Sequence, residues 1–308
     1  MKKKVSIIGA GNVGATTAQL VVQSGIADVV LFDIVDGVPQ GKALDLAEAC
    51  PLWNSSSTIK GTKKYADTTG SDIIVITAGL ARKPSMSRSD LLHANATIIK
   101  GVCIEIAKTS PTAIVIVVTN PMDVMAQLVW KTTEFSCKRV MGMGGILDAS
   151  RLRAFLSWEL HVSPEDIEAL VLGGHGDDMV PLSRFTTVKG IQITELLPKK
   201  KIDSLIERTR NGGAEIVSLL KSGSAYYAPA ASAFQMVKSI LLDEKRMLPC
   251  AAYLNGEYGT KDIYMGVPVI LGKEGIEKIV EIKLTKEERA QFRKSCSSVR
   301  KLIKKLSI

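Results

Sequence analysis

The sequence predicts an α/β fold, in which a doubly wound and mostly parallel sheet is followed by an α+β domain. Two near-continuous apolar runs, at 72–79 and 113–120, are typical of strands in a parallel sheet covered on both faces. Short alternating runs at 191–193 and 253–271 stand beside longer helical segments in the second half. We predict two domains, 1–145 and 146–308.

Composition excludes several classes of protein. A length of 308 residues with 46% hydrophobic and 23% charged residues is typical of a soluble globular protein of one large or two ordinary domains. The longest apolar runs are too short to span a bilayer, and glycines interrupt the segment after the lysine-rich start, unlike in a signal peptide. Five scattered cysteines without a CxxC pair argue against disulfides and against zinc. We expect a cytoplasmic protein that holds no metal and does not enter a membrane.

The net charge of +9 lies largely at the two ends of the chain, at 2–4 and 300–305. Such basic segments are compatible with nucleic-acid binding, or with a solvated helix face. Because no aromatic residues interleave the charges, we favour the solvated face and expect no nucleic-acid partner. A positive field would also attract a small dianionic substrate and an anionic cofactor.

The first strand of the predicted sheet ends at a glycine motif. An apolar run at 5–8 stops at the motif, a helical pattern follows at 15–24, and a second strand covers 28–33. In such a unit the first glycine makes a tight turn, the second lets a pyrophosphate approach, and the third lets helix and strand pack closely. The helix N-terminus offers free N–H groups to the phosphates. We therefore predict that a dinucleotide binds the motif, Gly9-Ala10-Gly11-Asn12-Val13-Gly14.

Asp33 ends the second strand, 19 residues after Gly14. A carboxylate at this place accepts hydrogen bonds from ribose hydroxyls and repels a 2′-phosphate, which favours NAD over NADP. The ends of the next two strands carry Gly79 and Asn120. Because the carboxyl ends of parallel strands meet at one edge of a sheet, we expect the ligand groove there.

A basic loop leaves this edge after Gly79 and carries Arg82, Lys83 and Arg88 before a helical segment at about 88–108. Arginine suits carboxylates because its planar fork makes two parallel hydrogen bonds. An ordinary solvated basic loop remains the alternative interpretation.

A strand ending at Gly142 leads into a helix that carries Asp148 and Arg151. The two residues are three apart and share a helix face. In one interpretation Asp148 is only the N-cap and Arg151 lies on the surface; in the other, Asp148 orients a histidine and Arg151 holds a carboxylate.

His175 is one of three histidines, and it stands between Gly174 and Gly176. Glycines on both sides suit a histidine that meets a substrate with backbone crowded around it, because they need no room for a side chain. A structural histidine in a turn is the alternative. Beyond it we expect long helices at 202–221, 230–242 and 285–306, the first of them bent or broken at Gly212-Gly213.

Taken together, these residues resemble the lactate/malate dehydrogenase family over essentially the whole chain, and most closely its lactate-dehydrogenase-like malate dehydrogenases. The resemblance rests on the motifs at 9–14, 33, 77–92, 118–121, 147–151 and 173–177. Ser85 departs from the pattern, since a glycine is common after the Arg-Lys-Pro of the loop. The family implies an NAD-dependent oxidoreductase of the tricarboxylic acid cycle that interconverts (S)-malate and oxaloacetate, and a homo-oligomer, either dimer or tetramer.

The resemblance also implies roles for the conspicuous side chains. His175 would accept and donate the proton with Asp148 on its other ring nitrogen, and Arg151 would hold the C1 carboxylate of the dicarboxylate substrate. Arg88 would polarise the carbonyl, and Arg82 would bind the second carboxylate, where lactate enzymes carry a glutamine. Residues expected at the substrate or the cofactor are Asn95, Val118, Thr119 and Asn120.

Three alternatives follow from the same residues. An L-lactate or other 2-hydroxy acid dehydrogenase would share the whole pattern except Arg82. A non-catalytic protein on this scaffold would be free to lose the histidine, aspartate or arginines, and all are present. A nucleic-acid binder would use the basic tail and would show a steep dependence on salt.

Overall fold

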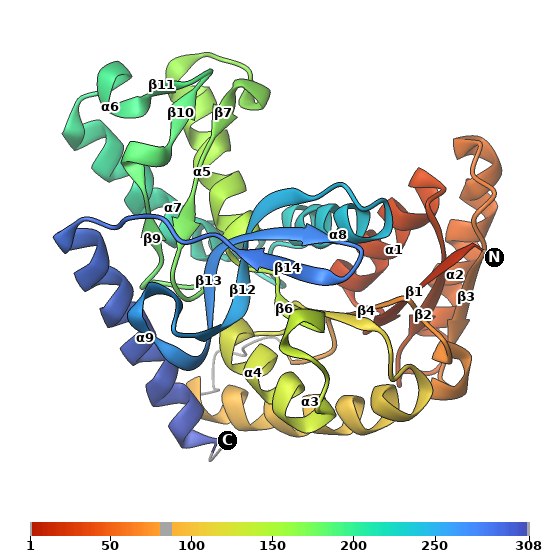
Figure 1. The fold of residues 1–308 in the computed structure, drawn as a ribbon. Helices are drawn as coiled ribbons and strands as arrows, with labels where there is room; N and C mark the ends of the chain where they lie inside the picture. Colours follow the sequence, from red (N-terminus) through yellow and green to blue (C-terminus); the bar gives the residue numbers. More distant parts are fainter. Residues whose placement is uncertain (1, 81–87, 307–308) are drawn as a thin grey trace.

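The computed structural model describes residues 2–80 and 88–306. Its central feature is a nine-stranded sheet with the order β14-β13-β12-β6-β5-β4-β1-β2-β3 (Figure 1). Six of these strands, from the first half of the chain, run parallel: β1 (Lys3–Ile8), β2 (Ala27–Phe32), β3 (Ile59–Thr62), β4 (Ile73–Ile76), β5 (Ile114–Val117) and β6 (Val140–Gly142). The order reverses between β1 and β4, which confirms the predicted doubly wound sheet.

Every residue of β4 and β5 is buried, as the continuous apolar runs predict. Helices cover both faces of these strands. α3 (Arg88–Thr109) and α4 (Met122–Thr133) pack together on one face, and α1 (Asn12–Ser24) packs against α8 (Tyr227–Leu241) on the other (Figure 1). α2 (Val38–Ala49) packs on β3 at the far edge of the sheet.

The second half of the chain extends the same sheet. β12 (Arg246–Asn255) joins β6 in antiparallel fashion, with Ala251 opposite Gly142, and β13 (Lys261–Gly272) and β14 (Gly275–Ile279) follow as a meander. The sequence predicts short alternating strands at 253–271, and this prediction is wrong. Instead, β12 has 10 residues and β13 has 12. α8 covers β13 on one face, and α4 and α9 (Lys286–Lys305) also pack against it, so both faces of β13 are buried.

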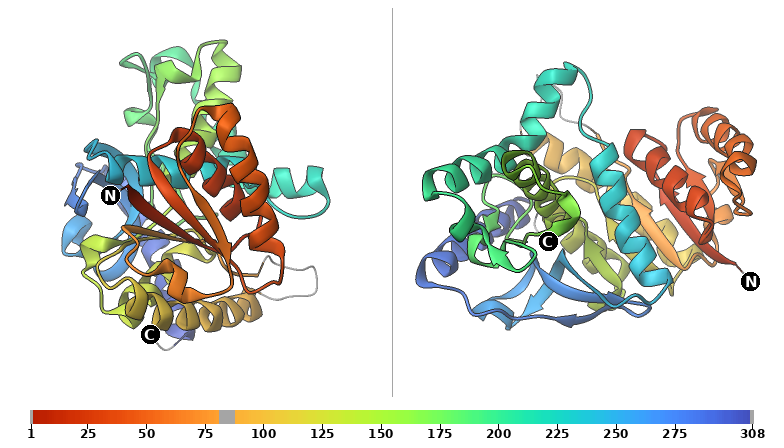
Figure 2. Two further views of the ribbon diagram at one scale, coloured as in Figure 1. Left: turned by 90° about the vertical axis from the view of Figure 1, so that its right-hand side faces the viewer. Right: turned by 90° about the horizontal axis from the view of Figure 1, so that it is seen from above.

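The rest of the second half forms a smaller layer around α5 (Gly145–Leu160) and α7 (Lys199–Leu220). It lies at the end of the molecule opposite the N-terminal strands (Figure 2). Its elements are β7 (Ile167–Glu168), β8 (Val171–Leu172), β9 (Val180–Pro181), β10 (Thr187–Val188), β11 (Ile191–Gln192) and α6 (Ile193–Leu196). Short 3₁₀ turns lie at Cys50–Trp53, Tyr65–Thr68, Cys137–Arg139, Pro164–Asp166, Ser183–Phe185 and Glu257–Gly259.

Two features concern the expected domain organisation. One hydrophobic core includes buried side chains from both halves of the chain, such as Ile116 and Met265, so the halves share a firm interface. α5 begins at Gly145, and the boundary between 1–145 and 146–308 stays a prediction. None of the helices in the described ranges has the length and apolar character needed to cross a membrane.

Candidate active site

The carboxyl ends of β1, β2 and β4 border one cleft of about 610 Å³. Gly9 and Gly11 line it from the loop after β1, Asp33 lines it from the end of β2, and Ala78 and Gly79 line it from the segment after β4. The structure therefore brings together the polar strand ends that the sequence places at one edge of the sheet.

The three glycines of the loop differ in what surrounds them. Gly9 has a φ of +115°, and a Cβ on Gly14 would lie 1.8 Å from the Gly9 carbonyl oxygen, so both are required by the packing of the loop itself. A Cβ on Gly11 would meet nothing within 4 Å. Gly11 lines the cleft and is also the N-cap of α1, where the first amide groups of the helix have no intrahelical partner. Open space at a helix N-terminus fits the pyrophosphate of a dinucleotide.

Asp33 is held at the end of β2 by two backbone amides. Its Oδ2 accepts a hydrogen bond from Ala10 N at 2.6 Å, and its Oδ1 accepts one from Val35 N at 3.0 Å. Each carboxylate oxygen has a further lone-pair direction available. The carboxylate is thus fixed beside the glycine loop with capacity to accept ribose hydroxyls.

Asn95 and Thr119 tie together the backbone around the cleft. Asn95 is fully buried, and its amide accepts from Leu80 N at 2.7 Å and donates to Asn120 O at 2.7 Å. The Thr119 hydroxyl donates to Ala78 O at 2.7 Å. These two residues fix the backbone around a ligand, whereas the side chain of Asn120 is exposed and Val118 is half-buried.

His175 and Asp148 form a hydrogen-bonded pair, with 2.9 Å between His175 Nδ1 and Asp148 Oδ2. Asp148 is buried in the first turn of α5, whose N-cap is Gly144, so Asp148 is not the cap. Arg151 Nη1 lies 3.6 Å from Asp148 Oδ1, and the Arg151 side chain is only 14% exposed. The interpretation that places Arg151 on the surface is therefore wrong.

This pair sets the protonation of the histidine. Burial disfavours the charged imidazole, but the Asp148 carboxylate outweighs burial through its charge and its hydrogen bond, and the pKa of His175 lies above its ordinary value of 6.5. Asp123 acts in the same direction, and the Arg151 guanidinium opposes both. The imidazolium is thus available near neutral pH.

Sequence reasoning missed Asp123, in the first turn of α4. Its Oδ2 accepts a hydrogen bond from His175 N at 2.8 Å, across 52 residues of sequence. Burial raises the pKa of the Asp123 carboxyl to about 6, although the hydrogen bond from His175 opposes the rise. The one available signal was a carboxylate three residues after Asn120, at the same sheet edge as the predicted groove.

The prediction for α7 is a bend or a break at Gly212-Gly213, and the break is absent, since one helix runs from Lys199 to Leu220. A Cβ on Gly212 would lie 3.1 Å from Arg151 Cδ, and one on Gly213 would lie 3.6 Å from Arg151 Nη2. The two glycines therefore let the α7 backbone approach the arginine closely. They serve side-chain packing and not helix termination.

The structure does not describe the side chains of two predicted substrate residues. Arg82, with the neighbouring Lys83, lies outside the described residues. Arg88 is the first residue of α3, and only its backbone placement is described.

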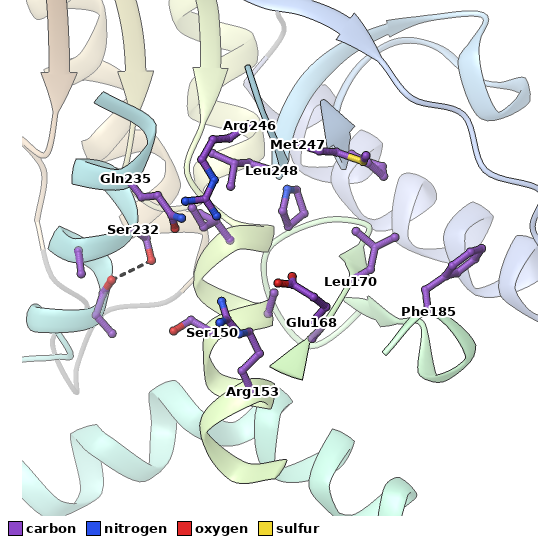
Figure 3. Close-up of a pocket in the computed structure, with 17 residues that line it drawn as sticks. Ser150, Arg153, Glu168, Leu170, Phe185, Ser232, Gln235, Arg246, Met247 and Leu248 are labelled. Atoms are coloured by element: carbon purple, nitrogen blue, oxygen red, sulfur yellow. Dashed lines mark hydrogen bonds between the residues drawn. The ribbon is translucent and has the colours of Figure 1, made fainter. Parts of the chain in front are cut away.

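A separate cavity of about 340 Å³ lies between α5, α8 and β12 (Figure 3). Ser150 and Arg153 line it from α5, together with Ile146 and Ala149 at helical spacing. Asp148 and Arg151 belong to the opposite face of that helix, and none of the predicted site residues lines this cavity.

Two family models match the chain. The one described as lactate/malate dehydrogenase, NAD binding domain, matches residues 3–142, and the one described as lactate/malate dehydrogenase, alpha/beta C-terminal domain, matches residues 146–307. Among individual proteins, a malate dehydrogenase of Desulforudis audaxviator (strain MP104C) is 54% identical over 307 residues, which cover 100% of this chain and 99% of the relative.

Solved structures with the same fold include both malate dehydrogenases and lactate dehydrogenases. The crystal structure of Cryptosporidium parvum malate dehydrogenase has a TM-score of 0.97 at 44% identity and covers 100% of this chain and 99% of its own. A lactate dehydrogenase of Cryptosporidium parvum, complexed with lactic acid and the nicotinamide dinucleotide cofactor, has a TM-score of 0.97 at 41% identity and covers 100% and 98%. The fold alone therefore does not distinguish between the two substrates.

Proposed function

The chain belongs to the lactate/malate dehydrogenase family, and from this membership we propose that it is an NAD-dependent malate dehydrogenase, which interconverts (S)-malate and oxaloacetate. The observation that carries the proposal is the hydrogen-bonded pair of His175 and the buried Asp148, with Arg151 beside it. α5 follows β6, the parallel neighbour of β5, so its first turn lies at the same sheet edge as the cofactor cleft.

NAD supplies the hydride acceptor when it is bound, and the protein supplies position and charge. His175 donates its Nδ1 hydrogen to Asp148, so in the neutral ring Nε2 carries the free lone pair. Nε2 takes the hydroxyl proton of malate as the C2 hydride leaves, and the O–H bonding electrons form the carbonyl. In the reverse direction the imidazolium returns that proton. Asp148 fixes the tautomer and stabilises the cation.

The substrate is a dianion and requires two cationic partners. Arg151 is the guanidinium for the C1 carboxylate, since a planar fork binds a carboxylate through two parallel hydrogen bonds. Arg82 binds the second carboxylate, and Arg88 polarises the reacting carbonyl. These two assignments rest on the sequence motif.

The same enzyme class acting on lactate is the second candidate, because a lactate dehydrogenase shares the fold at 41% identity. Arg82 opposes it, since pyruvate offers that guanidinium a methyl group and no counter-charge. Initial rates of NADH oxidation with oxaloacetate and pyruvate side by side, each repeated with NADPH, test substrate and cofactor together. Equal kcat/KM for the two acids would exclude the malate assignment, and equal rates with NADPH would exclude the role of Asp33.

We also propose that the enzyme works as a homo-oligomer in the cytoplasm. Large apolar side chains are exposed at Ile34, Leu44 and Leu52, in and around α2, and at Met247, on the rim of the second cavity. All five cysteines are free thiols, which suits a reducing compartment. Light scattering after gel filtration tests the assembly, and a monomeric mass at micromolar concentration would contradict it.

A further inference from the structure

The C-terminal helix α9 contacts the segment that carries His175, although more than a hundred residues separate them in sequence. Ser295, buried in the middle of α9, accepts a hydrogen bond from the backbone amide of Gly174 at 2.9 Å through its Oγ. Gly174 immediately precedes the histidine. The amide of the residue before the proposed catalytic group is thus fixed by a side chain of the last helix.

The fit between α9 and this segment leaves no room for side chains. A Cβ on Gly173 would lie 2.9 Å from Ser295 Oγ, and one on Gly174 would lie 2.9 Å from Val299 Cγ2. Gly173 is held from its other side by β13, where it exchanges backbone hydrogen bonds of 2.9 and 3.1 Å with Gly266. The two glycines before the histidine are therefore required by the contact with α9 and β13.

A second contact follows the histidine. The hydroxyl of Ser298 donates to Asp178 Oδ2 at 2.7 Å, and Lys294 Nζ lies 3.1 Å from Asp178 Oδ1. Ser295 and Ser298 are three residues apart and share the face of α9 that meets the segment. The helix therefore holds the segment on both sides of His175, through the backbone amide of Gly174 and the side-chain carboxylate of Asp178.

We infer that α9 positions the catalytic histidine, with Ser295 as the principal positioning residue and Ser298 as a second one. Loss of the Ser295 hydroxyl leaves the buried Gly174 amide without its acceptor, and the segment then relaxes to find another. Such a movement shifts the imidazole relative to the reacting oxygen, to which proton transfer is sensitive. This inference rests on the proposed function, because it takes His175 as the proton acceptor.

The test compares Ser295→Ala with Ser239→Ala in the full-length enzyme. Ser239 is a matched control, since it is also fully buried and its hydroxyl donates to a backbone carbonyl, that of Leu271, at 2.7 Å. We expect Ser295→Ala to lower kcat for oxaloacetate reduction about tenfold or more, the sensitivity of a reaction to small displacements of its groups. The dissociation constant for NADH, measured by fluorescence, stays unchanged in both variants, and Ser239→Ala keeps the wild-type kcat.

The kinetic isotope effect with NADH deuterated at the transferred position separates positioning from general instability. Misplacement of His175 slows the chemical step, so the isotope effect on kcat increases in Ser295→Ala, whereas partial unfolding lowers the active fraction and leaves it unchanged. If Ser295→Ala does not bind NADH, Ser298→Ala, at a half-buried position, decides by the same two measurements. Wild-type kcat and isotope effect in the deciding variant would overturn the inference. Failure of the wild-type enzyme to reduce oxaloacetate would instead overturn the proposed function.

Discussion

Nδ1 of His175 lies 2.9 Å from Oδ2 of Asp148, although 27 residues separate the two in sequence. Asp148 comes from the first turn of α5, and His175 follows β8, a strand that contacts α5. The carboxylate is buried and fixed by the helix, so it orients the imidazole without competing water. The proposed site leads to four predictions about the enzyme.

The first concerns the charge of Asp148. Asp148→Asn keeps the size of the side chain but removes the charge that stabilises the imidazolium, and it can present an N–H to Nδ1 and favour the wrong tautomer. We expect kcat/KM for oxaloacetate to fall by about 10²–10⁴-fold, the range up to the loss seen when a His-Asp pair loses its charge. Steady-state kinetics measure this, and Asp166→Asn, at a surface ion pair with Lys189, is the control. A loss under tenfold would show that Asp148 is only structural.

The second concerns pH. Burial lowers the pKa of His175, but the charge and the hydrogen bond of Asp148 outweigh burial, so this pKa lies above 6.5. Malate oxidation needs the neutral imidazole, so its kcat/KM falls as pH drops through the raised pKa; oxaloacetate reduction needs the imidazolium and falls as pH rises through it. Both profiles should therefore inflect above 6.5. Asp123→Asn keeps an oxygen for the His175 amide but removes a negative charge that raises the pKa of His175, so both inflections should move to lower pH. Unmoved profiles would contradict this role of Asp123.

The third concerns Arg82. An unpaired buried charge costs about 3–5 kcal/mol, so the wild-type enzyme should prefer oxaloacetate to pyruvate by at least about a hundredfold in kcat/KM. Arg82→Gln should lower activity on oxaloacetate and raise it on pyruvate, whereas Arg82→Lys keeps the charge and should keep the preference. A glutamine variant that loses oxaloacetate turnover and gains none on pyruvate would show that selectivity arises elsewhere.

The fourth compares two adjacent glycines of α7. In a helix interior each Gly→Ala change gains about 0.5–1 kcal/mol of stability where there is room. Gly212→Ala brings a Cβ to 3.1 Å from Arg151 Cδ and should displace the guanidinium, which raises KM for oxaloacetate. Gly213→Ala meets Arg151 at an ordinary 3.6 Å and should raise the melting temperature with little change in KM. Equal KM values in the two variants would contradict the packing role of Gly212.

Much of the fold and part of the site can be predicted from local patterns in the sequence. The apolar runs of β4 and β5, the glycine motif after β1 and the carboxylate at the end of β2 are local patterns, and the rule that parallel strands end at one edge brings them together. The helices predicted at 230–242 and 285–306 match α8 and α9 within a few residues at each end. Strand and helix periodicity is a short-range property, so a single sequence contains it.

Other features of the fold and the site depend on tertiary packing and could not be predicted from the sequence. Helix propensity predicts a bend or a break at Gly212-Gly213, but α7 is not broken there, and the two glycines lie against Arg151. The addition of β12–β14 to the parallel sheet depends on coverage by α4, α8 and α9. The hydrogen bonds of His175 to Asp123 and of Gly174 to Ser295 join residues 52 and 121 positions apart. Such contacts leave no periodic trace in the chain, because they depend on which faces the fold buries against each other.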